Sequence, residues 1–291
     1  MKRVLTIITA VAMLASCYKS DLSSTTHPDK GKMVINKLLP DDATPPAGGY
    51  TIIFNGESYN TTTTTTALDV EVAPGEYTIY VYSNHSEMSI DHDIDTSGEG
   101  TIISSKVVDA GMVESLTEDL YFGTQTITVL ADQVISSEIN LNQVTRDISF
   151  NLQITEGDPE RIVGVTATLS GIAGQWECVE DIPFGDAVTI ALEFTQGESL
   201  SKADVANDYL TGSIKVLGIN GTEQILTIEL TYSDGKSQKI VSDISAQLAD
   251  ANSNKSIAIT LSGDINTPIE SEQEGTITNW DQIIGGSETV N

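Results

Sequence analysis

The stretch Arg146–Thr155, with the sequence RDISFNLQIT, decides the fold class of this chain. Its apolar residues stand at every second position, namely Ile148, Phe150, Leu152 and Ile154. A strand turns successive side chains to opposite faces, so this period places one face on a core and the other in water. The stretch therefore predicts a half-buried strand of an antiparallel sheet.

The same alternation recurs further along the chain, around residues 188–194, 226–232 and 257–261. Turn signals separate the predicted strands, and Asn-Gly and Asp-Gly pairs supply the positive φ angles that tight hairpins need. These signals are Asn55-Gly56, Pro74-Gly75, Asn220-Gly221 and Asp234-Gly235. Only residues 201–210 and 243–251 have patterns that fit short helices. The sequence predicts an all-β protein built from β-sandwiches.

The length of 291 residues favours two domains. We place a signal peptide at 1–16, a polar tether at 17–31, β-sandwich domains at 32–144 and 145–268, and a C-terminal tail at 269–291. No Pro/Gly-rich linker marks the boundary near residue 144, so we expect the two domains to be tightly joined.

The charge of the chain excludes some partners. Its 42 acidic and 14 basic residues give a formal net charge of −28. Nucleic acids and anionic membrane surfaces are bound chiefly through Lys and Arg, and the only arginines are Arg3, Arg146 and Arg161. We therefore expect neither as a partner.

The N-terminus predicts export. Lys2 and Arg3 precede the apolar run Val4–Leu14, which is too short to span a membrane and fits a secretory signal. The ending Leu14-Ala-Ser-Cys17 resembles the lipobox of bacterial lipoproteins, in which the cysteine is acylated. This resemblance implies that Cys17 carries fatty acyl chains, palmitate among them, and holds the chain at the cell outer membrane and on its surface. The alternative is an ordinary signal peptide with a chance cysteine.

The remaining chemistry is sparse. If Cys17 is acylated, Cys178 has no disulfide partner in the chain, and a small buried hydrophobe is the favoured reading of it. No catalytic or phosphate-binding motif occurs, so we expect no enzyme activity, no metal and no cofactor.

One acidic segment leaves a choice open. Asp91, Asp93 and Asp95 resemble the start of a calcium loop, but Thr96 and Ile102 stand where such a loop needs Gly and Glu. The segment is either a solvated acidic loop or a calcium site, and the first reading is favoured.

Three diffuse segments point to a family. VAPGEYTIY at 72–80, DLYFG at 119–123 and LNQVTR at 141–146, together with the lipobox, resemble FimB-type fimbrial anchor lipoproteins of type V pili, in the fimbrillin-like superfamily. The resemblance implies two tandem transthyretin-like antiparallel β-sandwiches and a role in anchoring or assembling a pilus. It also implies strand exchange, in which an extended segment of one subunit completes the sheet of its neighbour.

The C-terminal tail is the candidate donor strand. The segment Gly275–Ile284, GTITNWDQII, follows a polar stretch and carries Ile277, Trp280, Ile283 and Ile284. An added strand satisfies the backbone groups of an open sheet edge and fills side-chain pockets. The alternative, which stays open, is that the tail packs on its own domain.

The arginine positions bear on the type of subunit. In structural pilins of the resembling class, a cut after Arg or Lys removes the first strand. This chain has no arginine between Val4 and Thr145, although Lys30, Lys32 and Lys37 remain. We therefore expect a lipid-anchored subunit that keeps its first strand and holds or helps assemble a pilus by strand complementation. The alternative is a glycan- or ligand-binding surface lipoprotein without catalysis.

Overall fold

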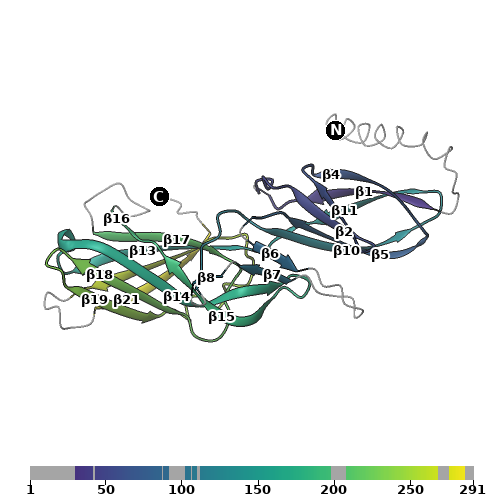
Figure 1. Cartoon of the computed structure of the whole chain (residues 1–291). Helices are drawn as coiled ribbons and strands as arrows, with labels where there is room; N and C mark the ends of the chain where they lie inside the picture. Colours follow the sequence, from purple (N-terminus) through teal and green to yellow (C-terminus); the bar gives the residue numbers. More distant parts are fainter. Residues whose placement is uncertain are drawn as a thin grey trace, which may run out of the picture. The chain divides into compact units, whose positions relative to one another are not determined.

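A computed structural model describes residues 30–41, 43–86, 88–91, 102–105, 107–109, 112–197, 208–267 and 275–285 of the chain. The regular structure of these residues is β-strand apart from one short 3-10 helix, η2 (Pro159–Arg161). The predicted all-β class is therefore confirmed (Figure 1). None of the helical structure in the described ranges is long and apolar enough to cross a membrane.

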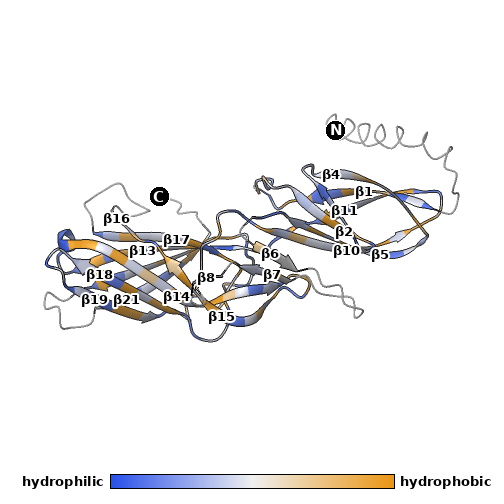
Figure 2. Cartoon of the chain, in the orientation of Figure 1, coloured by the Kyte–Doolittle hydropathy of each residue, from blue (hydrophilic) through white to orange (hydrophobic). Residues whose placement is uncertain are grey.

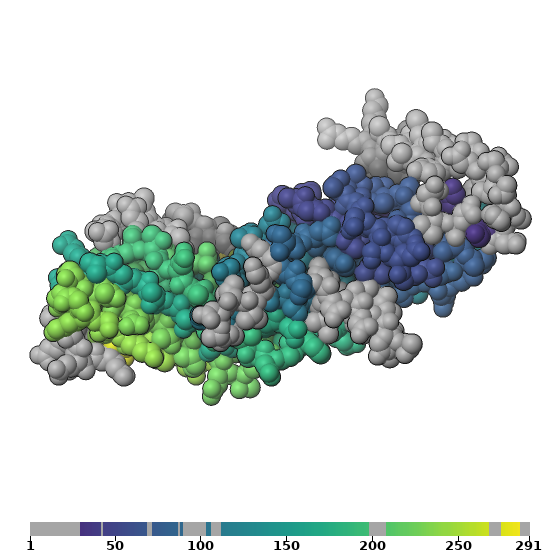
Figure 3. All heavy atoms as spheres, in the orientation of Figure 1, coloured from purple at the N-terminus to yellow at the C-terminus, as the bar shows by residue number. Residues whose placement is uncertain are grey.

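The chain forms two compact units. The first contains the described residues up to Asn84 together with Gly123–Leu141, and the second contains His85–Phe122 together with the described residues from Asn142 onward. This division differs from a single cut at residue 144, because the segment 85–122 belongs to the second unit. Figure 3 shows that side chains fill the spaces between the ribbons of Figure 1 within each unit.

The first unit is built from two sheets. Its strands are β1 (Gly31–Leu38), β2 (Tyr50–Phe54), β3 (Glu57–Thr61), β4 (Thr65–Val72), β5 (Gly75–Ser83), most of β10 (Tyr121–Val129) and β11 (Val134–Asn140). One sheet has the order β11-β1-β4, and the other has the order β10-β5-β2-β3. The first two residues of β10, Tyr121 and Phe122, belong to the second unit and pair there with β12 (Asn142–Gln143). The predicted Asn55-Gly56 turn joins β2 to β3, with φ angles of 52° and 78°.

The second unit is a larger sandwich. Its further strands are β6 (Met88–Asp91), β7 (Ile102–Ser105), β8 (Val107–Asp109), β9 (Met112–Val113), β13 (Arg146–Glu156), β14 (Ile162–Glu177), β15 (Ile182–Leu192), β16 (Thr195–Gly197), β17 (Tyr209–Val216), β18 (Ile225–Tyr232), β19 (Ser237–Asp243), β20 (Ile259–Asn266) and β21 (Thr276–Ile284). One sheet has the order β16-β17-β13-β20-β21, and the other has the order β19-β18-β14-β15-β9-β8.

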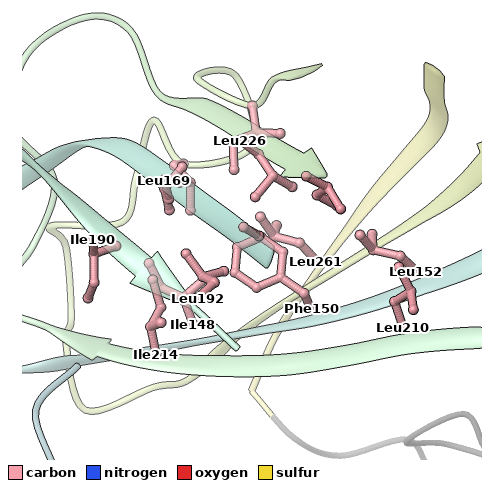
Figure 4. Packing of buried hydrophobic residues seen from close by; sticks show 14 of the residues in the cluster. Ile148, Phe150, Leu152, Leu169, Ile190, Leu192, Leu210, Ile214, Leu226 and Leu261 are labelled. Carbon is pink, nitrogen blue, oxygen red and sulfur yellow. The ribbon is translucent and has the colours of Figure 1, made fainter. Parts of the chain in front are cut away.

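Strand β13 lies at the centre of the first of these sheets and confirms the alternation from which the fold was predicted. Its side chains are buried at every second position from Arg146 to Ile154. Phe150 is fully buried, and its ring lies 5.8 Å from that of Phe194 at a steep angle. Figure 4 shows Phe150 among apolar side chains from strands of both sheets. Apolar residues likewise recur along the strands of both units in Figure 2.

The segment 85–122 joins the second unit by strand pairing. β7 pairs with the end of β14, where Ile103 lies opposite Trp176, and β9 pairs in parallel with β15. Val113 of β9 is only 2% exposed and belongs to the hydrophobic core of the sandwich. The second unit therefore uses side chains that precede residue 144 to close its core.

Two details differ from the sequence prediction. Most pairs are antiparallel as predicted, but β1 with β11, β13 with β20 and β15 with β9 run parallel. Parallel neighbours cannot be joined by a tight hairpin, so local turn signals do not reveal them.

The predicted helix at 243–251 is a series of turns instead. The Arg146 side chain donates hydrogen bonds to backbone carbonyl groups of this loop and of the residues that follow it. Its Nε donates to Ala251 O at 2.8 Å, and its two Nη atoms donate to Ser253 O and Ile257 O. Of the other predicted helix, residues 201–207 lie outside the described residues, and Leu210 belongs to β17.

Candidate functional site

The first strand of the chain is an integral part of its unit. β1 lies between β11 and β4 and pairs with both along most of its length. Its inward side chains, Met33 and Ile35, are fully buried. Removing β1 would take away the central strand of this sheet and open the core, since both neighbours would lose their ladder and these contacts.

The inward face of β1 ends at a buried lysine. Lys37 Nζ donates to Thr66 Oγ1 at 2.8 Å and lies 5.4 Å from the centre of the Tyr50 ring. Burial lowers the pKa of Lys37 to about 8. A lysine at this depth is a poor substrate for a protease that cuts after basic residues, because the scissile bond must be extended and accessible to enter such a site.

The predicted C-terminal strand exists as β21. In this structure it pairs antiparallel with β20 of its own chain, with Thr276 opposite Asn266 and Ile284 opposite Ile259. The structure brings Ile277 and Trp280 together against the core of the second unit. It leaves Ile283 half-buried and Ile284 55% exposed, so the four predicted donor residues do not form one buried row.

A bulge shapes the contact between β21 and β20. Asn279 and Trp280 lie opposite Gly263, because the pairing shifts between Ser262 and Asp264, and Asn279 has a φ of 51°. The Trp280 ring packs close against Gly263. A side chain at residue 263 would crowd this ring, since a Cβ there would lie 3.2 Å from Trp280 Cε3. We call Trp280, Gly263 and Ser242 of β19 the Trp280 contact, because Trp280 Nε1 also donates to Ser242 Oγ at 3.0 Å.

A polar network holds the start of β13 in the second unit. Asp119 Oδ1 accepts hydrogen bonds from Gln143 Nε2 at 3.1 Å and Thr145 Oγ1 at 3.2 Å, and Lys215 Nζ donates to it as well. Lys215 also donates to Asp147 Oδ2 at 2.9 Å. Burial opposes the charge of Lys215, but the hydrogen bonds to both carboxylates outweigh burial and raise its pKa.

A second network lies deep in the same unit. Lys255 Nζ donates to Val144 O at 2.9 Å and to Leu217 O at 2.6 Å, and it lies 2.8 Å from the centre of the Trp176 ring. Trp176 Nε1 donates to Asp181 Oδ1 at 3.0 Å. Burial lowers the pKa of Lys255 to about 7. Neither network was found from the sequence, since their members lie up to about a hundred residues apart.

Cys178 is a free, buried cysteine, as the sequence predicted. Burial is the main cause that raises the pKa of its thiol, with the charge of Glu177 adding to it. A protonated, buried thiol is neither a nucleophile nor a metal ligand.

Two predicted sites fall largely outside the described residues. Cys17 lies there, as do Asp93 and Asp95 of the acidic segment, while Asp91 ends β6. Among the residues that the structure describes, no group of three or more His, Cys, Asp or Glu side chains is arranged to hold a metal ion.

Comparisons with solved structures give the same fold. The fimbrial anchor protein Mfa2 from Porphyromonas gingivalis matches with a TM-score of 0.57 and 13% identity over 87% of this chain and 97% of that chain. A candidate adhesin from Bacteroides thetaiotaomicron matches with a TM-score of 0.59 and 10% identity over 89% and 97%. A candidate polysaccharide-binding protein from the same species matches with a TM-score of 0.55 and 10% identity over 87% and 98%.

The sequence itself gives the family. No curated protein sequence matches the chain. The family model for fimbrillin-A associated anchor proteins Mfa1 and Mfa2, however, matches residues 29–283, which include nearly all of the described residues. This range also spans the three segments on which the fimbrial resemblance was based. The chain belongs to the family of fimbrillin-A associated anchor proteins.

Proposed function

We propose that this chain is a lipid-anchored surface protein that holds a pilus at the cell outer membrane and joins it by β-strand complementation. The single observation that carries the proposal is the family match over residues 29–283. Two features of the structure support it: an occupied first-strand position and an exposed terminal strand.

The occupied first strand fits the end of a fibre. Because β1 already fills the middle of its own sheet, a neighbour has no vacant strand position to enter there. A subunit of this kind stops strand exchange in one direction. An anchor needs this property, since the fibre must end on it.

The terminal strand β21 fits the opposite role, that of donor. None of its nine residues is buried, although β20 beside it is buried at every second position. An edge strand with so little buried surface can leave its sheet at a much lower cost than a core strand. Pairing with the open sheet of a neighbour would then replace the backbone hydrogen bonds that β21 loses when it leaves β20.

The membrane attachment rests on Cys17. The signal Leu14-Ala-Ser-Cys17 supports acylation, and the acidic body of the chain offers no other route to an anionic membrane surface. Cys17→Ala should release the protein from the membrane fraction, whereas Cys178→Ala, which changes the other cysteine, should leave it there. Retention of Cys17→Ala after a high-salt wash would show that the protein is not held by lipid.

The pilus attachment is tested on the tail. A chain that ends before Gly275 keeps every buried strand, so the isolated protein should remain folded while its binding to pilus fibres is lost. Circular dichroism of the isolated protein and co-sedimentation with fibres would measure the two properties. A truncated chain that binds fibres like the full chain would rule out the tail as the donor.

A further inference from the structure

The donor strand proposed above is not free in this structure, since β21 is paired with β20. A strand that inserts between two strands of a neighbour pairs along both of its edges, but the edge of β21 that faces β20 already uses its backbone groups. Insertion of β21 into the sheet of a neighbour therefore requires that β21 first leaves β20.

We propose that the Trp280 contact is a latch that holds β21 on its own domain and that must open before the strand is donated to a pilus subunit. This inference rests on the proposed function, and it adds a regulated step to it. The latch consists of the Trp280 ring over Gly263 and the hydrogen bond from Trp280 Nε1 to Ser242 Oγ.

The side-chain contacts that hold β21 on its own domain lie close together, around Gly263. Ile277 and Trp280 are its only side chains that pack against the core cluster, and both lie beside Gly263. A Cβ at residue 263 would lie 2.9 Å from Ile277 Cγ2 and 3.2 Å from Trp280 Cε3. Glycine at 263 is therefore what allows the close approach of both side chains.

The latch also connects the two sheets of the sandwich. β21 belongs to the sheet of β13, whereas Ser242 lies on β19, the edge strand of the other sheet. A parallel bridge between Ile240 and Gly275 lies at the start of β21 on the same side. Opening the latch would thus free one edge of the sandwich without disturbing the inner strands, which keep their own ladders.

The latch can be tested on the isolated chain, without any pilus. A branched side chain in Gly263→Val should displace Ile277 and Trp280, so hydrogen exchange of the β21 amides should become at least tenfold faster. Exchange in β13 and β18 should stay unchanged, because these strands lie inside the sheets. Trp280→Ala should have the same effect by removing the ring. Unchanged exchange of β21 in both variants would overturn the latch.

A reversible crosslink tests whether the latch must open. Thr260 and Ile283 are register partners on β20 and β21, so Thr260→Cys with Ile283→Cys can join the two strands by a disulfide. Thr227→Cys with Val241→Cys, on β18 and β19, is the matched control. The buried Cys178 should not interfere.

We expect the oxidised β20–β21 crosslink to reduce co-sedimentation with pilus fibres at least tenfold, and reductant to restore it. The oxidised control pair should bind fibres like the unmodified chain. If the crosslinked strand binds fibres equally well, the latch need not open and the inference is wrong. If the unmodified chain itself fails to bind fibres, the proposed function is wrong, and the exchange measurement still decides whether the latch exists.

Discussion

Replacing Lys255 should change how the stability of the second unit depends on pH. Lys255 is 5% exposed, and its pKa falls from 10.5 to about 7, chiefly because burial disfavours the charged form. The unfolded chain therefore holds this proton over a pH range in which the folded chain has released it. The free energy of unfolding then rises with pH, because the unfolded state binds more protons.

The magnitude follows from the two pKa values. Between pH 7 and pH 9 the unfolded lysine stays almost fully protonated while the folded one loses its proton, which raises the free energy of unfolding by about 2 kcal/mol. Free thiols begin to titrate in the upper part of this window. The raised pKa of the Cys178 thiol therefore acts in the opposite sense near pH 9, and the Lys255 contribution is the difference between the unmodified chain and a Lys255 variant, since both contain Cys178.

The assay is urea unfolding followed by tryptophan fluorescence at both pH values. Trp176 and Trp280 are the two tryptophans of the chain and both belong to the second unit, so the signal reports on that unit. Lys255→Met should be less stable overall, because Val144 O and Leu217 O lose their donor. It should also lose the rise of about 2 kcal/mol between the two pH values.

Lys239→Met on the exposed side of β19 is the control and should keep the pH dependence of the unmodified chain. A Lys255→Met variant with the same rise between pH 7 and pH 9 as the unmodified chain would refute the assignment. The group whose proton release stabilises the fold between pH 7 and pH 9 would then be another one than Lys255.

Three further predictions concern the second unit. Phe150→Ala should lower the free energy of unfolding by about 3–5 kcal/mol, because removal of a fully buried ring leaves a cavity. Equilibrium unfolding measures this free energy, and a loss below about 1 kcal/mol would contradict the burial of the ring. Asp119→Ala should lower the free energy of unfolding by about 1–3 kcal/mol, since Gln143 and Thr145 lose an acceptor. Glu118→Ala, which removes the exposed carboxylate next to Asp119, is the comparison, and equal stability of both variants would contradict the role of the network. A fragment that begins at Asn142 should fail to fold alone, because it lacks the buried side chains Ile103 and Val113. If urea unfolding of that fragment shows a sharp transition, these side chains are dispensable.

The strand pattern could be predicted from local sequence because burial in a sandwich follows the period of two. β13 and β18 show this directly, with alternate residues buried in both. The hairpin at Asn55-Gly56 was predictable for a similar reason, since its positive φ angles depend on two adjacent residues. The family could also be recognised, because its motifs are continuous segments.

Which strands pair with one another cannot be predicted from the sequence of each strand alone. Residues 85–122 read as strands of the first domain, and only the folded chain shows that β7 and β9 complete the second. The same holds for β20, which lies parallel to β13 across a separation of about a hundred residues. A two-residue period tells which face of a strand is buried, but many neighbours can bury that face equally well.

The sequence alone predicted the all-β class and a strand near the C-terminus with Trp280 in it, and the structure has both. Export and lipidation at Cys17 stay predictions from the sequence. Tertiary structure decided where that strand lies. Trp280 meets Gly263 and Ser242 only because β21 lies at the edge of its sheet, beside β20, and β19 lies at the edge of the other sheet. Neither Gly263 nor Ser242 stands out in the sequence. Local patterns arise from the backbone geometry of a few neighbouring residues, whereas contacts between edges depend on the packing of the whole sandwich.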